Sequence, residues 1–404
     1  MTLRWLGNKT ALLDEILSVA RSAGYRGGTV CDLFAGSGSV GRFFRSQGSR
    51  VISTDLMSCS LVFQKAYLET IEAPTFSGIE DLWGGLEPLD LSRLSVLDEG
   101  QRSEWIPFLQ LANYLENHLP PQQGFLFRQF SPEGDAGRIY LTGENAARVD
   151  AILEAIRNWR VSGVVTDQEV WILLASCIDA VDRVANISGT YGAFLKKLQK
   201  SAERPLELRS PAIVPGPPGA AHNEDALEWI NGVECELLYI DPPYNQRQYP
   251  ANYHLPEILS LLPFEDSDQK IEETLYGKTG LIPWKEKASP LCSRRGDECL
   301  RAMQKLIEGS NANIIVFSYS EEGILQREQL EKLLGDWSDS GTGANLNLVE
   351  IPYRRFRSDS EEGSSQTPGG RTFKPAPGRS MDEVQEWLFV ATRKSNIERV
   401  RNES

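Results

Sequence analysis

Histidine and paired cysteine are scarce in this chain of 404 residues. It has three histidines and six cysteines, and no two cysteines stand in a Cys-x-x-Cys pair, so we expect no zinc site and no other metal site. Scattered single cysteines are typical of a reducing compartment, which favours the cytoplasm. These residues are Cys31, Cys59, Cys177, Cys235, Cys292, Cys299, His118, His222 and His254.

Long apolar runs are also missing. The uncharged run in the apolar middle of the chain, Val170–Ile178, is nine residues long, about half of the roughly 20 that a membrane helix needs. At the N-terminus, residues 1–7 are followed by Asn8 and Lys9 before an apolar core of secretory length can develop. We therefore expect neither a membrane span nor a signal peptide.

Positive charge is in deficit. Lys and Arg together number 42 against 56 Asp and Glu, which gives a formal net charge of −14. This average argues against a polyanion as partner, because the chain as a whole repels negative charge. The hydrophobic share of 41% and the length are nevertheless ordinary for a folded protein of two or three domains.

Strand and helix patterns alternate near the N-terminus and again after residue 219. Apolar residues at helical spacing over Lys9–Arg21 predict a helix, and Thr29–Phe34 and Arg50–Asp55 predict strands around a glycine-rich turn. This succession indicates a layered α/β unit. The later predicted strands are Glu236–Asp241, Asn313–Tyr319 and Glu386–Thr392.

The middle of the chain, residues 73–211, has longer helical patterns, and the proline-rich segment Pro211–Gly219 marks its end. The simplest assembly is a catalytic sheet domain made of residues 1–72 and 212–404, interrupted by this helical insertion. Residues Ser358–Pro377 are rich in Ser, Gly and Pro and are predicted to be a mobile loop. The helices predicted in the insertion are Asn145–Arg160, Thr166–Val184 and Tyr191–Lys200.

A glycine cluster follows the first predicted strand. Gly36, Gly38 and Gly41 have the G-x-G-x-x-G spacing of dinucleotide-binding turns, at the place where doubly wound sheets bind ligands. Phe34 would lie beside such a ligand, and Asp55, at the end of the next strand, could bind a ribose diol. Both suit an adenosine group, and the alternative is a tight turn that binds nothing.

The strand Glu236–Asp241 ends in Asp-Pro-Pro-Tyr. Pro242 and Pro243 remove backbone donors and fix φ, so the Asp241 carboxylate and the Pro242 carbonyl form a rigid pair of acceptors. Such a pair fits the exocyclic NH₂ of a nucleobase, and Tyr244 offers a face on which the base can stack. The alternative is a cis-proline turn with a capping aspartate.

These acceptors suggest a chemistry. The N6 lone pair of adenine is delocalised into the ring, which makes the amine a poor nucleophile. Two acceptors that hold both hydrogens draw the nitrogen toward tetrahedral geometry and direct its lone pair outward. A methyl sulfonium placed in line then completes a direct transfer that needs neither a covalent enzyme intermediate nor a metal.

Together these motifs resemble the alpha class of N6-adenine DNA methyltransferases, the Dam-like group of restriction-modification systems. Arg4–Lys9 resembles its N-terminal motif, Asp32–Gly38 its cofactor loop and Asp241–Tyr244 its catalytic motif. The resemblance implies a Rossmann-like mixed α/β sheet of the S-adenosylmethionine-dependent methyltransferases, with a helical target recognition domain inserted at 73–211. It also implies S-adenosylmethionine as cofactor, duplex DNA as substrate, a cognate restriction endonuclease and a bacterial, nucleoid-associated location.

The resemblance assigns roles to individual residues. Asp225 could equally be a helix N-cap, and Trp5 could equally be a core anchor. The N-terminal motif departs from many relatives by having Leu-Gly-Asn rather than Ala-Gly-Gly before its lysine, and Asn245–Tyr249 with Asn252–His254 resembles a subgroup's extension of the catalytic motif. The catalytic residues are Asp241, Pro242, Pro243 and Tyr244, and the cofactor-binding residues are Trp5, Lys9, Asp32, Phe34, Gly36, Gly38, Asp55 and Asp225.

A base inside a duplex cannot reach such a pocket, so it must be flipped out, and phosphate contacts must help to offset the cost. Segments 183–209 and 353–379 carry more basic than acidic residues and provide local positive charge on an acidic chain. The alternative for each is a solvated helix face or loop. The expected DNA contacts are Lys196, Lys197, Arg247, Arg354 and Arg355.

Other functions stay open at this point. The same pocket would serve RNA adenine or the N4 amine of cytosine, because it recognises any exocyclic amine. A non-catalytic DNA-binding protein on a degenerate fold is the alternative from another class. Methylation at cytosine C5 needs a nucleophilic cysteine, and the chain has no Pro-Cys dipeptide, which argues against it.

Overall fold

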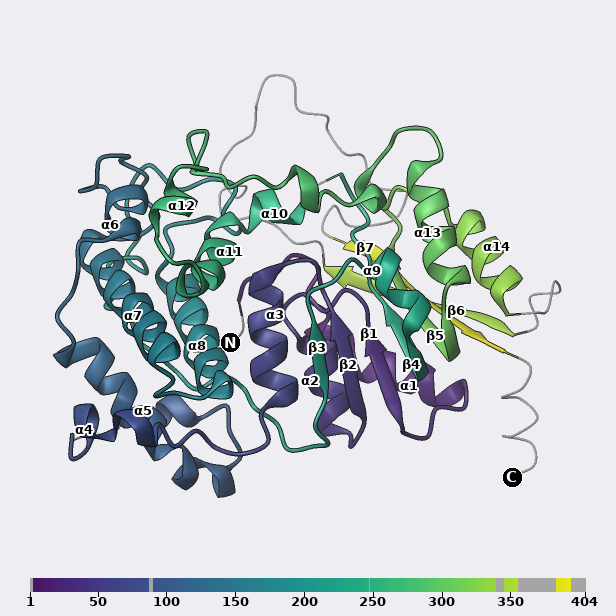
Figure 1. Cartoon of the computed structure of the whole chain (residues 1–404). Coiled ribbons are helices and arrows are strands. Elements are labelled where there is room, and N and C mark those ends of the chain that lie inside the picture. The colour runs from purple at the N-terminus through teal and green to yellow at the C-terminus, as the bar shows by residue number, and fades with distance from the viewer. Residues whose placement is uncertain (1–2, 87–89, 247, 339–344, 355–382, 394–404) are drawn as a thin grey trace.

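The computed structural model of the chain describes residues 3–86, 90–246, 248–338, 345–354 and 383–393. Its centre is a seven-stranded sheet in the order β3-β2-β1-β4-β5-β7-β6, in which β7 runs opposite to the other six described strands (Figure 1). The expected mixed α/β sheet is confirmed. The strands are β1 (Thr29–Asp32), β2 (Arg50–Thr54), β3 (Ala220–His222), β4 (Glu234–Ile240), β5 (Asn311–Ser320), β6 (Leu346–Arg354) and β7 (Glu383–Thr392).

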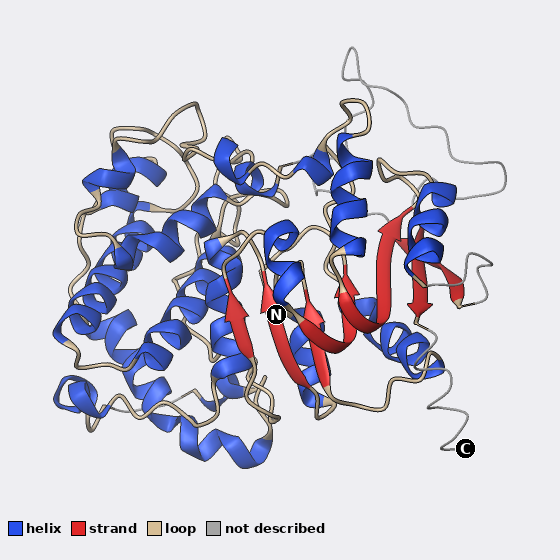
Figure 2. Cartoon of the chain, turned by 45° about the vertical axis from the view of Figure 1, so that its right-hand side comes forward, coloured by secondary structure: helices blue, strands red, loops and turns tan. Residues whose placement is uncertain are grey.

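Successive side chains of the central strands enter two separate cores. In β5, Ile314 and Val316 pack into one core, and Ile315 and Phe317 pack into the other. This period of two is expected of a strand that is covered on both faces. Figure 2 shows helices on both sides of the sheet. The first face is covered by α1 (Leu13–Ser22), α2 (Ser39–Ser46) and α3 (Ser58–Gln64), and the second by α9 (Ala226–Trp229), α13 (Glu298–Glu308) and α14 (Arg327–Trp337).

The residues between α3 and β3 form a helical layer beside the sheet (Figure 1, left). Its two long helices begin after Thr142 and Thr166, whose side chains accept a backbone N–H of the first turn. Glu169 accepts the Thr166 N–H in return and completes a capping box. The helices are α4 (Glu80–Trp83), α5 (Ile106–Asn113), α6 (Phe125–Phe130), α7 (Gly143–Ser162) and α8 (Asp167–Val184).

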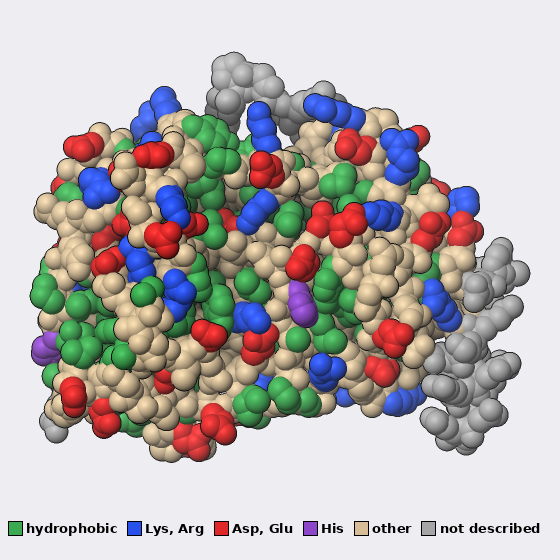
Figure 3. Space-filling model, in the orientation of Figure 1, with side chains coloured by type: hydrophobic (Ala, Val, Ile, Leu, Met, Phe, Trp, Pro, Cys, Tyr) green, Lys and Arg blue, Asp and Glu red, His purple; other side chains and the backbone are tan. Residues whose placement is uncertain are grey.

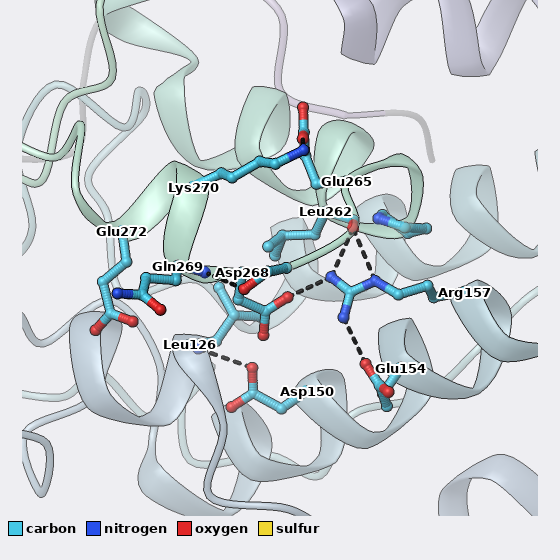
Figure 4. Close-up of polar contacts among 12 residues, drawn as sticks. Leu126, Asp150, Glu154, Arg157, Leu262, Glu265, Asp268, Gln269, Lys270 and Glu272 are labelled. Carbon is cyan, nitrogen blue, oxygen red and sulfur yellow. Dashed lines mark hydrogen bonds and ion pairs between the residues drawn. The ribbon is translucent and has the colours of Figure 1, made fainter.

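A later segment of the chain joins this helical layer. Arg157 of α7 donates to the Leu262 carbonyl at 2.7 Å and pairs with Asp268 (Figure 4). The layer therefore includes residues from beyond the proline-rich boundary, and the division at 73–211 stays a prediction. The joining helices are α10 (Tyr249–Asn252), α11 (His254–Leu261) and α12 (Gln269–Glu272).

The helix predicted over Tyr191–Lys200 is wrong, because these residues form turns and irregular backbone. Their N–H groups find partners outside a helix: Tyr191 donates to the Asn252 carbonyl at 2.9 Å, and Leu195 donates to the Asn186 carbonyl at 2.9 Å. The Asn186 side-chain amide also donates to the Leu195 carbonyl. These competing bonds remove the helical ladder that the apolar spacing favours.

Two strands of the sheet were not predicted, namely β3 and β6. Both lie at sheet edges, where strand patterns are short or interrupted by polar residues. The loop predicted over Ser358–Pro377 lies outside the described residues.

Candidate active site

A cleft opens at the carboxyl ends of β1 and β4, where the strand order reverses direction. All four candidate catalytic residues line it, and so do all candidate cofactor residues except Gly38. These lining residues are Trp5, Lys9, Asp32, Phe34, Gly36, Asp55, Asp225, Asp241, Pro242, Pro243 and Tyr244.

The glycine turn between β1 and α2 is held in one conformation. Gly36 has φ +51°, and its N–H donates to Asp55 Oδ2 at 2.8 Å, while its carbonyl accepts the Ser60 hydroxyl at 2.7 Å. Gly38 has φ +77° and precedes the first residue of α2. A Cβ on Gly38 would lie 2.8 Å from the Tyr67 ring. Gly36 therefore shapes the cleft, whereas Gly38 allows the turn to pack closely against the Tyr67 ring.

Asp32, at the end of β1, is a buried acid without a cation beside it. It is 1% exposed, and neither of its carboxylate oxygens has a side-chain or backbone partner of normal hydrogen-bond geometry within the described ranges. Burial raises the pKa of Asp32 to about 8, and the negative charges of Asp241 and Asp55 add to the rise. A buried carboxylate at the wall of a cleft is suited to a ligand that brings its own positive charge.

Two further acids lie along the cofactor side of the cleft. Asp55 accepts the N–H groups of Gly36 and Met57, the latter at 2.9 Å, so its carboxylate is fixed in orientation. Burial raises the pKa of Asp55, and these two N–H groups partly oppose the rise. Asp225 accepts the Leu227 N–H at 2.9 Å as the N-cap of α9, and it also lines the cleft. The N-cap interpretation of Asp225 is therefore confirmed, and its contact with a cofactor stays a prediction.

The N-terminal motif, Arg4–Lys9, contacts the segment that follows the catalytic motif. Trp5 stacks on Tyr253 with ring centroids 4.3 Å apart, and the Leu6 N–H donates to the Tyr253 hydroxyl at 2.7 Å. Tyr249 donates through its hydroxyl to the Leu6 carbonyl at 3.1 Å. Trp5 is thus both part of an aromatic cluster and part of the cleft wall.

Lys9 bridges Asp241, which follows β4, and Glu386 of β7. Its ammonium lies 3.1 Å from Asp241 Oδ1 and 2.9 Å from Glu386 Oε1. Burial favours the neutral amine, but attraction to Asp241 and Glu386 outweighs burial, so the pKa of Lys9 lies well above its usual value. Burial raises the pKa of Asp241, Lys9 lowers it, and the charge of Glu386 raises it further.

Tyr244 forms a wall of the cleft next to Asp241. Its half-buried ring packs edge-on against Tyr319 with centroids 6.1 Å apart, and its backbone carbonyl accepts the Ile324 N–H at 2.9 Å. The Lys9 ammonium lies 6.0 Å from the ring centroid. These contacts fix the position of the Tyr244 ring, and a base can stack on the part of the ring that stays exposed to the cleft.

Sequence reasoning missed Glu386. Its strand, β7, is apolar at Trp387–Ala391, and a single acid beside such a run is the signal that could have revealed it. Glu386 is 3% exposed and accepts the Ser318 hydroxyl at 2.5 Å. It is absent from the residues that line the cleft in the described part of the chain.

The candidate DNA contacts are only partly within the structure. Lys196 and Lys197 are exposed, whereas Arg247, Arg355 and the side chain of Arg354 lie outside what is described. Acidic and basic side chains are intermixed over the face seen in Figure 3. Within the described ranges, no cluster of His, Cys, Asp and Glu is arranged to hold a metal ion, and no helix has the length and apolar character of a bilayer span.

Comparison with known proteins gives consistent matches. A family model described as D12 class N6 adenine-specific DNA methyltransferase matches residues 5–333. The chain is 34% identical over 368 residues to the Type II methyltransferase M.FokI of Planomicrobium okeanokoites, which covers 90% of this chain and 51% of that protein. The modification methylase StsI of Streptococcus sanguinis is 32% identical over 88% of this chain and 49% of its own length.

A third relative differs in coverage. The Type II methyltransferase M.NlaIII of Neisseria lactamica is 31% identical over 82% of this chain and 85% of its own length. The chain thus spans about half the length of the first two relatives and most of the third.

Proposed function

Since the chain belongs to the family of D12 class N6 adenine-specific DNA methyltransferases, we propose that it transfers a methyl group from S-adenosylmethionine to adenine N6 in DNA. One observation carries this proposal: the glycine turn after β1 and the Asp-Pro-Pro-Tyr turn after β4 open into the same cleft. A cofactor held by the first turn would meet a base held by the second.

The described residues fit this cofactor. When bound, S-adenosylmethionine supplies an electrophilic methyl group on a positively charged sulfur. Asp32 provides the carboxylate that a cationic ligand needs, because neither of its oxygens has a hydrogen-bond partner among the described residues. Asp55 would accept from the ribose hydroxyls, while Trp5, Phe34, Gly36 and Asp225 shape the rest of the cofactor side. Both the family and these residues support S-adenosylmethionine as the proposed cofactor.

The base side follows from the turn after β4. Asp241 and the Pro242 carbonyl accept the two N–H bonds of the amine, and Tyr244 stacks on the flipped base. The amine nitrogen forms a bond to the methyl carbon as the carbon–sulfur bond breaks, with its electron pair kept by sulfur. One amine proton is then lost to solvent, because the methylated base is neutral.

The remaining roles concern DNA and location. We propose that residues 73–211 form the target recognition domain, which selects a specific duplex sequence. Lys196, Lys197, Arg247, Arg354 and Arg355 would contact phosphates. Two relatives are named as a Type II methyltransferase and a modification methylase, and we propose a role beside a cognate restriction endonuclease. We also propose a location in the bacterial cytoplasm at the nucleoid.

The test follows tritiated methyl transfer to duplex DNA, with hydrolysis of the product to identify the methylated base. The wild-type protein should yield N6-methyladenine. Asp241→Ala should abolish transfer while calorimetry still detects cofactor binding, and Asp336→Ala, on the exposed side of α14, should behave like wild type. N4-methylcytosine or methylated RNA as the main product would overturn the substrate, and full activity of Asp241→Ala would overturn the catalytic assignment.

A further inference from the structure

Glu386 is a buried acid that belongs neither to the cofactor side nor to the base side of the cleft. Its carboxylate contacts Lys9, whose ammonium lies 2.9 Å from Glu386 Oε1 and 3.1 Å from Asp241 Oδ1. Ser318, from the neighbouring strand β5, donates to the same Oε1 and fixes the carboxylate. A buried charge is costly unless it is paired, so this arrangement calls for an explanation.

Charge gives the explanation. Lys9 and Asp241 alone would form a neutral pair, and the Lys9 cation would then oppose the positive charge that develops on the amine during methyl transfer. Glu386 adds a second negative charge, so the three groups together carry a net charge of about −1 when both acids are ionised. An environment of this sign stabilises a developing cation.

Geometry adds a second effect. The ion pair engages Oδ1 of Asp241, which leaves Oδ2 to accept an N–H of the base. Lys9 can hold this position only if its ammonium is anchored on the side away from the cleft. Glu386 is the group that lies there, since it contacts Lys9 but does not line the cleft.

We propose that Glu386 is a positioning residue for the transfer step: it anchors Lys9 against Oδ1 of Asp241 and keeps the charge of the cluster negative. The inference rests on the proposed function, because it concerns the amine that Asp241 would hold. Among the described residues, further titratable groups interact electrostatically with this cluster. They are Asp32 of β1, Tyr239 of β4, Tyr244 after β4 and Tyr249 of α10.

The main test is Glu386→Gln, which keeps the shape and an acceptor for Ser318 but removes the charge. Single-turnover methyl transfer at the pH plateau should fall at least about tenfold, whereas the Kd values for cofactor and DNA should change less than about twofold. Transfer needs ionised Asp241, and the charge of Glu386 raises the pKa of that acid, although burial is the larger cause. In Glu386→Gln, the acid limb of the pH–rate profile should therefore move to lower pH.

Ser318→Ala is the matched control. It removes the hydrogen bond to Glu386 and keeps the charge, so we expect a smaller loss of rate and an acid limb at the wild-type pH. A Glu386→Gln variant with wild-type rate, or with a reduced rate and an unmoved acid limb, would show that Glu386 is merely structural and would overturn the proposal.

A double-mutant cycle separates action through Lys9 from direct action. In a Lys9→Gln background, Glu386→Gln should cause no further loss of rate, and additive losses would contradict the proposal. Thermal unfolding gives a readout that is independent of activity. Lys9→Gln should lower the Tm because it leaves two buried acids unpaired, and adding Glu386→Gln should restore part of it. If this restoration occurs but the wild type methylates no adenine, the proposed function fails while the ion-pair cluster stands.

Discussion

The indole of Trp5 lies directly over Gly36, and a Cβ on Gly36 would come within 2.5 Å of the indole Nε1. Trp5 cannot easily move away, because it is stacked on Tyr253 and its chain neighbour Leu6 is hydrogen-bonded to the same tyrosine. The glycine turn, the N-terminal motif and the segment after the catalytic motif therefore meet at one point of the cleft.

Gly36→Ala should weaken cofactor binding by about tenfold or more, since the new methyl group must displace Trp5 or the turn. Gly48→Ala is the matched control, because Gly48 also has a positive φ but has open space around its Cβ position. Calorimetry with S-adenosylmethionine on both variants separates crowding from backbone strain. Equal affinities for the two variants would contradict this account of the contact.

Asp32 should make cofactor affinity depend on pH. Its pKa of about 8 means that it is largely protonated at pH 7 in the free protein, whereas a cationic ligand needs the ionised form. The affinity for S-adenosylmethionine should thus rise between pH 6 and pH 8, by up to about tenfold per unit. Asp32→Asn should bind more weakly and with a flatter pH dependence, as measured by calorimetry at each pH.

Asp32→Asn should weaken cofactor binding but stabilise the folded, cofactor-free protein. The pKa of Asp32 is higher in the folded than in the unfolded state, so its contribution to folding is lost as pH rises toward 8. Asp32→Asn should therefore raise the Tm of the cofactor-free protein at pH 8 more than at pH 5. A Tm difference that does not grow with pH would speak against a buried, unpaired carboxyl group.

Tyr244 should contribute to holding the flipped base through its ring. Tyr244→Ala should weaken binding of target DNA by about 1–3 kcal/mol and reduce the fluorescence of 2-aminopurine placed at the target position. Tyr244→Phe keeps the ring and should bind nearly as well as wild type. Tyr114→Ala, away from the cleft, serves as the control. Loss of the fluorescence signal in the phenylalanine variant would instead assign the role to the hydroxyl.

The exposed pair Lys196 and Lys197 should contribute to phosphate binding. Replacing both with alanine should reduce the slope of log affinity against log salt concentration by about 1.8, because each phosphate contact contributes about 0.9. Lys332→Ala is the control, since Lys332 is paired with Asp336 on α14. A slope equal to that of wild type would remove these lysines from the DNA interface.

Much of the site could be predicted from local sequence. The Asp-Pro-Pro-Tyr turn after an apolar run and the Gly36 and Gly38 turn after another are complete signals, because turn chemistry and strand period involve only neighbouring residues. The parallel strands β1 and β4 then bring both turns to one edge of the sheet. The prediction of a shared cleft therefore needed only the assumption that the two strands lie side by side.

The sequence by itself determined the strands that carry the site, the acids at their ends and the class of chemistry. Only the tertiary structure decided which groups meet: the Asn186 carbonyl takes the Leu195 N–H that a helix over 191–200 would have used, and Glu386 reaches Lys9 because the strand order places β7 beside β5. Periodicity and turn chemistry act over a few residues, whereas the pairing of buried charges depends on packing between segments far apart in the chain.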